Sequence, residues 1–168
     1  MIKRSLELFL KYIGIVELSL LSALIVTLPL NFIGIKDTAK DWVYSAVMFL
    51  IIAAGVFLLS YREGYSDRQY EKKKDLISLT IVFVLQIIIG LPFKYAMYTS
   101  GPAFFLGSLV KWYTTHTTLD TIGDAPLWMH VVPLIICDLI LIPVWFSGKK
   151  AGRKKREKDR QSLTKEKT

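Results

Sequence analysis

Three polar side chains inside otherwise apolar segments are the residues of this sequence best suited to carry chemistry. Glu17, Gln86 and Asp138 each lie about eight to ten residues from one end of a long apolar run, which places them at similar depths at 1.5 Å of helix rise per residue. A charged side chain near the centre of a bilayer costs about 2.5–3.5 kcal/mol on insertion scales, so it usually faces protein or water. The spacing therefore predicts that the three side chains lie near the midplane and meet.

The chemistry that such a cluster suits is binding of a proton or a hard cation. Pro143 cannot donate a hydrogen bond to the carbonyl of Leu139, next to Asp138, so this carbonyl is free to act as a ligand. Carboxylate, amide and carbonyl oxygens favour hard cations over soft transition metals. One hypothesis is thus a small oligomeric transporter or channel. The alternative, which we favour, is structural: Gln86 hydrogen-bonds across helices, and the carboxylates are protonated or are paired with Lys11 or with a partner subunit.

Small residues mark a second feature of the first apolar run. Ser19, Ala23 and Thr27 recur every four residues and form a stripe suited to close helix packing. Glu17 lies about 200° around the helix from Ser19 at 100° per residue, so it points to nearly the opposite side. Because both faces of this helix require protein contacts, we expect a homo-oligomer or a complex with a partner membrane protein.

Motifs for enzymes, cofactors and metals do not stand out. The sequence contains no His-Glu-x-x-His, Gly-x-Ser-x-Gly or phosphate-binding glycine loop, and its one cysteine, Cys137, excludes an internal disulfide. His116, Asp120 and Asp124 would share a face only if Thr117, Thr118 and Gly123 were helical, so no metal site is predicted. We predict a non-enzymatic accessory, assembly or scaffold component of a membrane complex, without cofactor. An enzyme acting on lipid is the least supported class.

The elements that must position these residues follow from composition. Of 168 residues 52% are hydrophobic, and they concentrate in runs long enough to cross a bilayer core of about 30 Å rather than at helical or strand period. The predicted fold is all-α, a polytopic membrane protein with four transmembrane helices and an extra interfacial or re-entrant helix in the second outer loop, residues 93–126. The predicted spans are residues 8–35, 42–61, 76–92 and 127–146.

Lysine and arginine indicate the orientation. The N-terminal stretch holds three, the loop after the second span five and the C-terminal tail ten, whereas the other two loops together hold four. Segments rich in these residues stay cytoplasmic, so both termini are predicted on the cytoplasmic side, in the plasma (inner) membrane.

The chain divides into a transmembrane domain, residues 1–147, and a basic tail, residues 148–168. The tail lacks interleaved aromatic residues for stacking bases, so nucleic acid is not an expected partner. Its high charge predicts disorder or a frayed helix and attraction to anionic lipid headgroups. The expected lipid contacts are Lys149, Lys150, Arg153, Lys154, Lys155 and Arg156.

Overall fold

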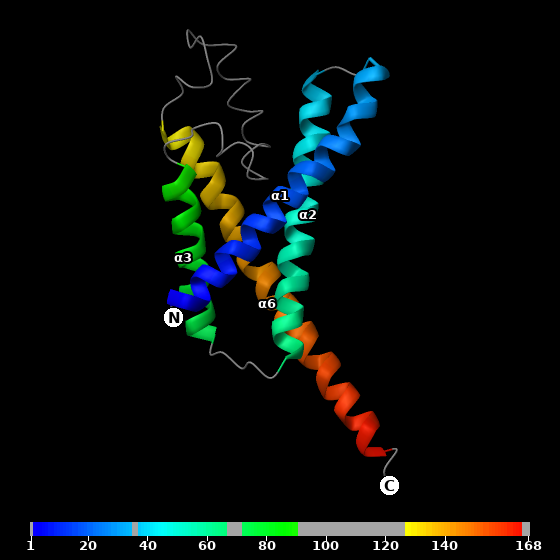
Figure 1. The fold of residues 1–168 in the computed structure, drawn as a ribbon, viewed down its shortest axis with the longest axis vertical. Coiled ribbons are helices and arrows are strands. Elements are labelled where there is room, and N and C mark those ends of the chain that lie inside the picture. The colour runs from blue at the N-terminus through cyan, green and yellow to red at the C-terminus, as the bar shows by residue number, and fades with distance from the viewer. Residues whose placement is uncertain (1, 35–36, 67–71, 91–126, 166–168) are drawn as a thin grey trace.

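Long helices make up the structure, a computed structural model that describes residues 2–34, 37–66, 72–90 and 127–165. The described residues confirm the all-α prediction. The extra helix expected within residues 93–126, together with His116, Asp120 and Asp124, lies outside the described residues. The helices are α1 (Ile2–Phe32), α2 (Asp37–Tyr65), α3 (Lys72–Gly90) and α6 (Leu127–Lys165) (Figure 1).

Two of these helices are long and apolar enough to cross a membrane by length and composition. They contain the segments Lys3–Leu30 of α1 and Ala46–Tyr65 of α2. Helix α3 begins with Lys72, Lys73, Lys74 and Asp75, so only residues 76–90 of it are free of charge. The described residues therefore support two candidate spans on this criterion rather than the predicted four.

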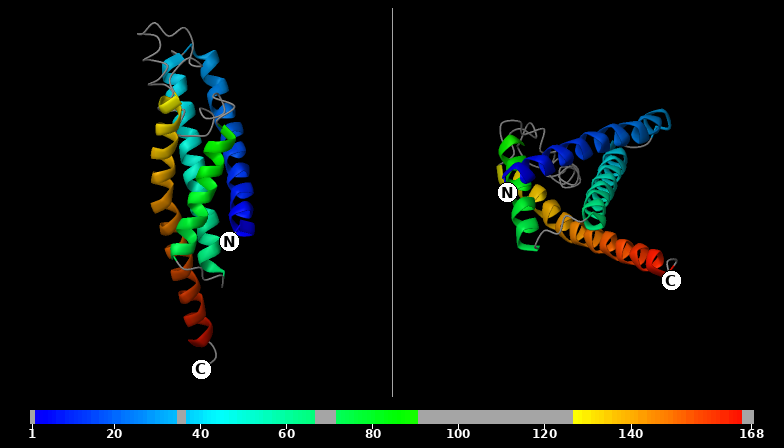
Figure 2. Two further views of the ribbon diagram at one scale, coloured as in Figure 1. Left: turned by 90° about the vertical axis from the view of Figure 1, so that its left-hand side faces the viewer. Right: turned by 60° about the horizontal axis from the view of Figure 1, so that its bottom comes forward.

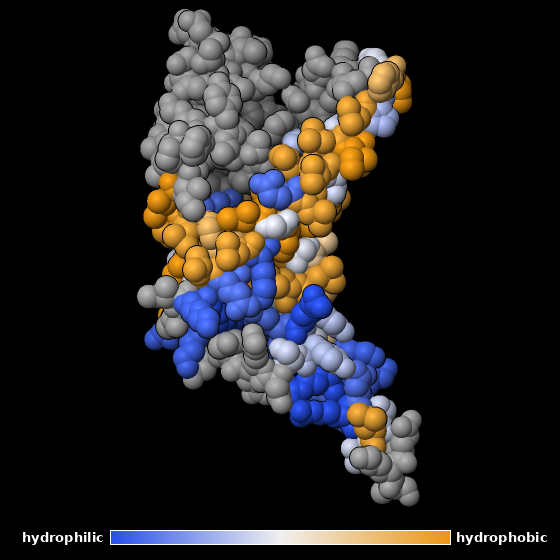
Figure 3. Space-filling view, in the orientation of Figure 1, coloured by the Kyte–Doolittle hydropathy of each residue, from blue (hydrophilic) through white to orange (hydrophobic). Residues whose placement is uncertain are grey.

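The helices run up and down in sequence order, so that α1 and α2 form an antiparallel pair (Figures 1 and 2). The most extensive contact joins α2 to α6, followed by that between α1 and α2, while α3 packs on α1 and, less closely, on α6. On the face shown in Figure 3, apolar side chains predominate over the middle of the molecule and along α1 and α2 toward the upper end, and blue, hydrophilic residues gather toward the end where α6 emerges. The interior cluster consists of Leu8, Phe9, Tyr12, Ile52, Val56, Leu79, Val82, Leu141 and Trp145.

Glycines bring the backbones of α2 and α6 together. A Cβ atom at Gly148 would collide with the Ser60 hydroxyl and the Phe57 carbonyl, and one at Gly64 would collide with the Lys149 carbonyl. Gly152 is as tightly enclosed, by the backbone of α2. Ser60 and Gly64 on one helix thus face Gly148 and Gly152 on the other, two small-residue pairs at a spacing of four that permit close helix approach.

Helix α6 continues well past the predicted domain boundary at residue 147. The sequence predicts disorder or a frayed helix for this tail, and in the structure the helix extends to Lys165. The extension starts from an existing helix, so it avoids the cost of nucleation, and its lysine, arginine, glutamate and glutamine residues favour helix. Lys155 pairs with Asp159 at 3.0 Å, and Tyr65 of α2 donates a hydrogen bond to Asp159 at 3.1 Å.

Candidate functional site

A network of charged side chains joins all four helices near one end of the bundle. Arg4 of α1 donates through Nη2 to Oε2 of Glu63 on α2 at 2.9 Å and to Oδ1 of Asp75 on α3 at 2.6 Å. Lys149 of α6 donates to the other oxygen, Oδ2, of Asp75. We call these four residues the charged layer.

The charged layer is buried although it lies close to the end of the bundle. The side chains of Asp75 and Lys149 are only 1% and 5% exposed, and those of Arg4 and Glu63 are 13% and 17% exposed. Removing charges from water is costly unless each one is paired with an opposite charge, and each of these four residues has such a partner. These ion pairs link the ends of the four helices to one another.

An apolar layer follows the charged layer along the helix axes. Leu8, Leu79, Val82 and Trp145 are buried there, one to two helical turns from Arg4, Asp75 and Lys149. Together with neighbouring side chains they enclose a cavity of only about 20 Å³. This layer leaves little room between the charged layer and the polar groups deeper in the bundle.

Gln86 and Asp138 lie beyond that apolar layer and are brought together by the fold. Both come close to Tyr12 of α1, whose phenol is buried near the Gln86 amide and the Asp138 carboxylate. Neither polar atom of Gln86 nor Oδ2 of Asp138 has a hydrogen-bond partner within the described part of the chain. We call Tyr12, Gln86 and Asp138 the polar layer; its buried atoms are left with unused hydrogen-bonding capacity.

Glu17 does not join the polar layer. Its side chain is exposed, on a different side of α1 from Tyr12. It belongs to a row of exposed positions spaced alternately by four and three residues, the spacing of a helix that packs along another helix at a shallow left-handed angle. This row, which we call the α1 seam, consists of Leu10, Gly14, Glu17, Leu21, Leu24 and Leu28.

The small-residue stripe of α1 faces inward. Ser19 and Ala23 are fully buried, and Thr27 is partly buried. The two hydroxyl groups donate to carbonyls of their own helix, Ser19 to Val16 at 2.6 Å and Thr27 to Ala23 at 2.8 Å. The stripe therefore packs against neighbouring helices without leaving a hydroxyl unpaired.

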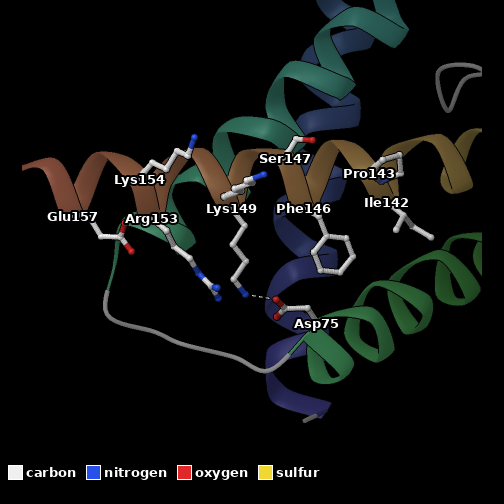
Figure 4. A pocket seen from close by; sticks show the side chains of 10 residues that line it. Asp75, Ile142, Pro143, Phe146, Ser147, Lys149, Arg153, Lys154 and Glu157 are labelled. Atoms are coloured by element: carbon white, nitrogen blue, oxygen red, sulfur yellow. Dashed lines mark hydrogen bonds and ion pairs between the residues drawn. The ribbon is translucent and has the colours of Figure 1, made fainter.

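The six basic residues predicted to contact lipid divide into three sets. Lys149 is buried in the charged layer, whereas Lys155 and Arg156 contact Asp159 and the Ser66 carbonyl. The other three residues line a groove of about 790 Å³ between α6 and the start of α3 (Figure 4). The groove is lined by Asp75, Ile142, Pro143, Phe146, Ser147, Lys149, Lys150, Arg153, Lys154 and Glu157.

Sequence reasoning did not identify the charged layer. Arg4 enters only as a count of positive charge, Lys149 is expected to contact lipid, and Asp75 lies just before the predicted third span. The usable signal is a lone carboxylate at the first turn of an apolar helix, at the same predicted end as basic residues of two other helices. The small-residue pair at Gly148 and Gly152 was also missed, because it begins just beyond the apolar run.

Function has to be inferred from these features alone. The described residues contain no group of three or more metal-ligating side chains that could hold an ion. Comparisons with family models, curated proteins and solved structures give no match for this chain.

Proposed function

We propose that this protein is a non-enzymatic, four-span membrane component that docks on a partner membrane protein through the α1 seam. The observation that carries the proposal is the exposed Glu17 side chain within an otherwise apolar row. Facing lipid, a carboxylate would be costly, whereas against a partner helix it could accept hydrogen bonds from a lysine, an arginine or an amide. Charge complementarity disfavours a second copy as the partner, because parallel copies would bring Glu17 against Glu17.

Gly14 gives the seam a second property of a docking surface. Among the residues that the structure describes, a Cβ atom at Gly14 would meet nothing within 4 Å, so this glycine is not needed for packing against them. In membranes an exposed glycine lets a neighbouring helix approach closely. Next to Glu17, one turn away, it would bring the partner's donor within reach of the carboxylate.

The proposed topology places both termini in the cytoplasm of a cell with the chain in its plasma (inner) membrane. The N-terminus, the end of α2, the start of α3 and the extension of α6 gather toward one end of the molecule (Figure 1), which supports the assignment from basic residues. Fusions of a fluorescent protein and of a periplasmic phosphatase test it. We expect fluorescence from fusions after residues 66 and 168, and phosphatase activity from fusions within residues 93–126. Phosphatase activity at residue 66 or 168 would contradict the topology.

Site-specific photo-crosslinking in native membranes tests the seam. A photoreactive amino acid is placed at Leu21 in the seam or, as a control, at Leu58 of α2, since the two side chains are 56% and 59% exposed. We expect one membrane protein, identified by mass spectrometry, to crosslink at Leu21 and not at Leu58. Equal adducts at both positions would indicate random encounters and would refute the seam.

Gly14→Leu supplies the decisive companion variant. The added side chain meets open space in the isolated chain, so the purified protein should retain its helix content and melting behaviour. The crosslink at Leu21 should nevertheless fall at least severalfold, because a leucine holds the partner helix away. An undiminished crosslink with the same partner would exclude close docking at this seam.

A second candidate function, a midplane proton or cation site, is favoured by the polar layer. Buried polar groups without partners are uncommon in native proteins and often mark unseen water, ions or a catalytic role. Gln86 and Asp138, both near Tyr12, supply three atoms without a hydrogen-bond partner in the described part of the chain. Glu17 would not take part in this site in the isolated chain because its side chain is exposed.

Flux measurements separate the second candidate from the first. Asp138→Asn is compared with the unmodified protein in proteoliposomes with a pH gradient or a cation gradient. Transport predicts a loss of flux with the oligomeric state unchanged. Unchanged flux with intact crosslinking at Leu21 would leave the docking role and eliminate transport.

A further inference from the structure

The groove beside the charged layer changes character along its length. Figure 4 shows Ile142 and Phe146 pointing to the same side of α6 as Lys149 and Arg153, so apolar side chains give way to cationic ones within three helical turns. A ligand that fits both ends must itself be apolar at one end and anionic at the other. This combination is the chemistry of a phospholipid.

Charges within the groove do not cancel. Lys149 is engaged with Asp75, which leaves Glu157 as the remaining lining carboxylate against three lining cations, Lys150, Arg153 and Lys154. In Figure 4 the Arg153 guanidinium extends beside the Lys149–Asp75 pair. None of the ion pairs found within the described ranges includes Arg153. A guanidinium in this setting matches the oxygen atoms of a phosphate group.

The size and position of the groove are also suitable for a phospholipid. Its volume of about 790 Å³ falls within the range of about 300–1,000 Å³ usual for small-molecule sites. In the four-span arrangement proposed above, Phe146 lies near the cytoplasmic end of the fourth span and Arg153 about 10 Å further along α6, at 1.5 Å per residue. That separation corresponds to the step from acyl chains to headgroup.

We propose that this groove is a specific site for an anionic phospholipid. The phosphate binds Arg153 and Lys150, and the acyl chains run along Ile142, Pro143 and Phe146. The bound lipid would neutralise the cationic side of the groove directly beside the charged layer.

Native mass spectrometry of the whole protein in mild detergent tests this inference. The probes are dioleoyl phosphatidylglycerol, dioleoyl phosphatidylcholine and water-soluble glycerol phosphate. Lys150→Gln with Arg153→Gln removes two cations from the groove, and Lys158→Gln with Arg160→Gln removes two exposed cations of the same helix outside it. The two double variants have the same net charge, so they separate a site from general attraction.

We expect one phosphatidylglycerol to bind in preference to phosphatidylcholine and the groove variant to weaken this binding by about tenfold or more, from the loss of two basic contacts. The control variant should weaken it less than about twofold.

Equal losses of binding in both variants would mean that general surface charge, and not a specific site, attracts the lipid. Equal binding of phosphatidylcholine would exclude recognition of the headgroup. If glycerol phosphate displaced the lipid at equal concentration, the site would be one for free phosphate, and the lipid assignment would be wrong. None of these outcomes alters the crosslink at Leu21, so failure of this inference is distinguishable from failure of the docking proposal.

Discussion

The charged layer and the polar layer are both buried and polar, but they differ in their partners: each charge of the first lies beside an opposite charge, whereas the second contains polar atoms without a hydrogen-bond partner among the described residues. In the charged layer Asp75 accepts from Arg4 through one oxygen and from Lys149 through the other, and Glu63 accepts from the same nitrogen of Arg4, Nη2. In the polar layer Gln86 uses neither of its polar atoms within the described residues. About 16 Å of helix, the 11 residues from Asp138 to Lys149, separates the two.

This difference separates structure from candidate function. A network in which each charge lies beside an opposite charge fixes the helices. A layer with unpaired buried atoms costs stability unless something else, such as water, a proton or an ion, completes it. We therefore expect a structural role for the charged layer, and we expect any additional bound species at the polar layer.

Neutralising Asp75 should produce the largest effect. Asp75→Asn leaves the buried Lys149 and Arg4 with too few counter-charges, and losing one partner of a buried ion pair costs about 3–5 kcal/mol. The free energy of unfolding, measured by titration with a denaturing detergent, should fall by that amount. Glu7→Gln is the control, because the Glu7–Lys11 pair is exposed and such pairs contribute about 0.5 kcal/mol. If the two substitutions lowered the free energy of unfolding equally, the charged layer would not be a major source of stability.

The second largest loss of stability should come from a larger side chain at the contact between α2 and α6. Gly148→Leu forces apart the two helices that carry Glu63 and Lys149, and overpacking of this kind costs about 1–3 kcal/mol. Gly14→Leu is the matched control, because both substitutions gain the same helix propensity and only Gly148 is enclosed. Comparison of their unfolding free energies isolates the steric cost. A Gly148→Leu protein as stable as Gly14→Leu would contradict the close contact.

Removing the unpaired amide should have a smaller effect and the opposite sign. Gln86→Leu keeps side-chain volume and eliminates two buried atoms without partners, so the free energy of unfolding should stay the same or rise by about 1 kcal/mol. The same detergent titration measures it. A loss above about 1 kcal/mol would mean that Gln86 is already hydrogen-bonded, and the contrast between the two layers would disappear.

The smallest effect concerns the exposed contacts beyond the charged layer. The hydrogen bond from Lys155 lowers the pKa of the Asp159 carboxyl below its usual value, and the hydrogen bond from Tyr65 acts in the same direction. A lowered carboxyl pKa stabilises the extension of α6 above the unfolded pKa of about 3.9, and this stabilisation is lost as the pH falls through the folded value. As the pH falls from 5 to 3, amide hydrogen exchange within residues 155–165 should therefore become faster relative to the rate expected for an unstructured chain at the same pH. Asp159→Asn should abolish that step, and a step that persists in the variant would assign it to another group.

Parts of both layers could be predicted from the sequence. Depth counting along the apolar runs placed Gln86 and Asp138 at one level, and the fold brings both beside Tyr12. The same counting included Glu17, yet its side chain is exposed, because depth along a helix does not define the direction in which a side chain points. Charge counting found the basic helix ends but not their pairing, since Arg4, Asp75 and Lys149 come from three distant segments.

The sequence by itself determined the helices, since long apolar runs and good helix formers specify this local structure wherever they pack. It also determined that Glu17 and Ser19 point to opposite sides of α1, because helical periodicity is local. Tertiary structure alone decided which side chains have partners: Asp75 has two cationic partners, whereas neither polar atom of Gln86 has a hydrogen-bond partner among the described residues. Partners depend on how distant helices approach. It also decided how the extension of α6 is held, since the extension contacts Tyr65 of α2 and Ser66, the residue after it, whereas the sequence predicts disorder or a frayed helix there.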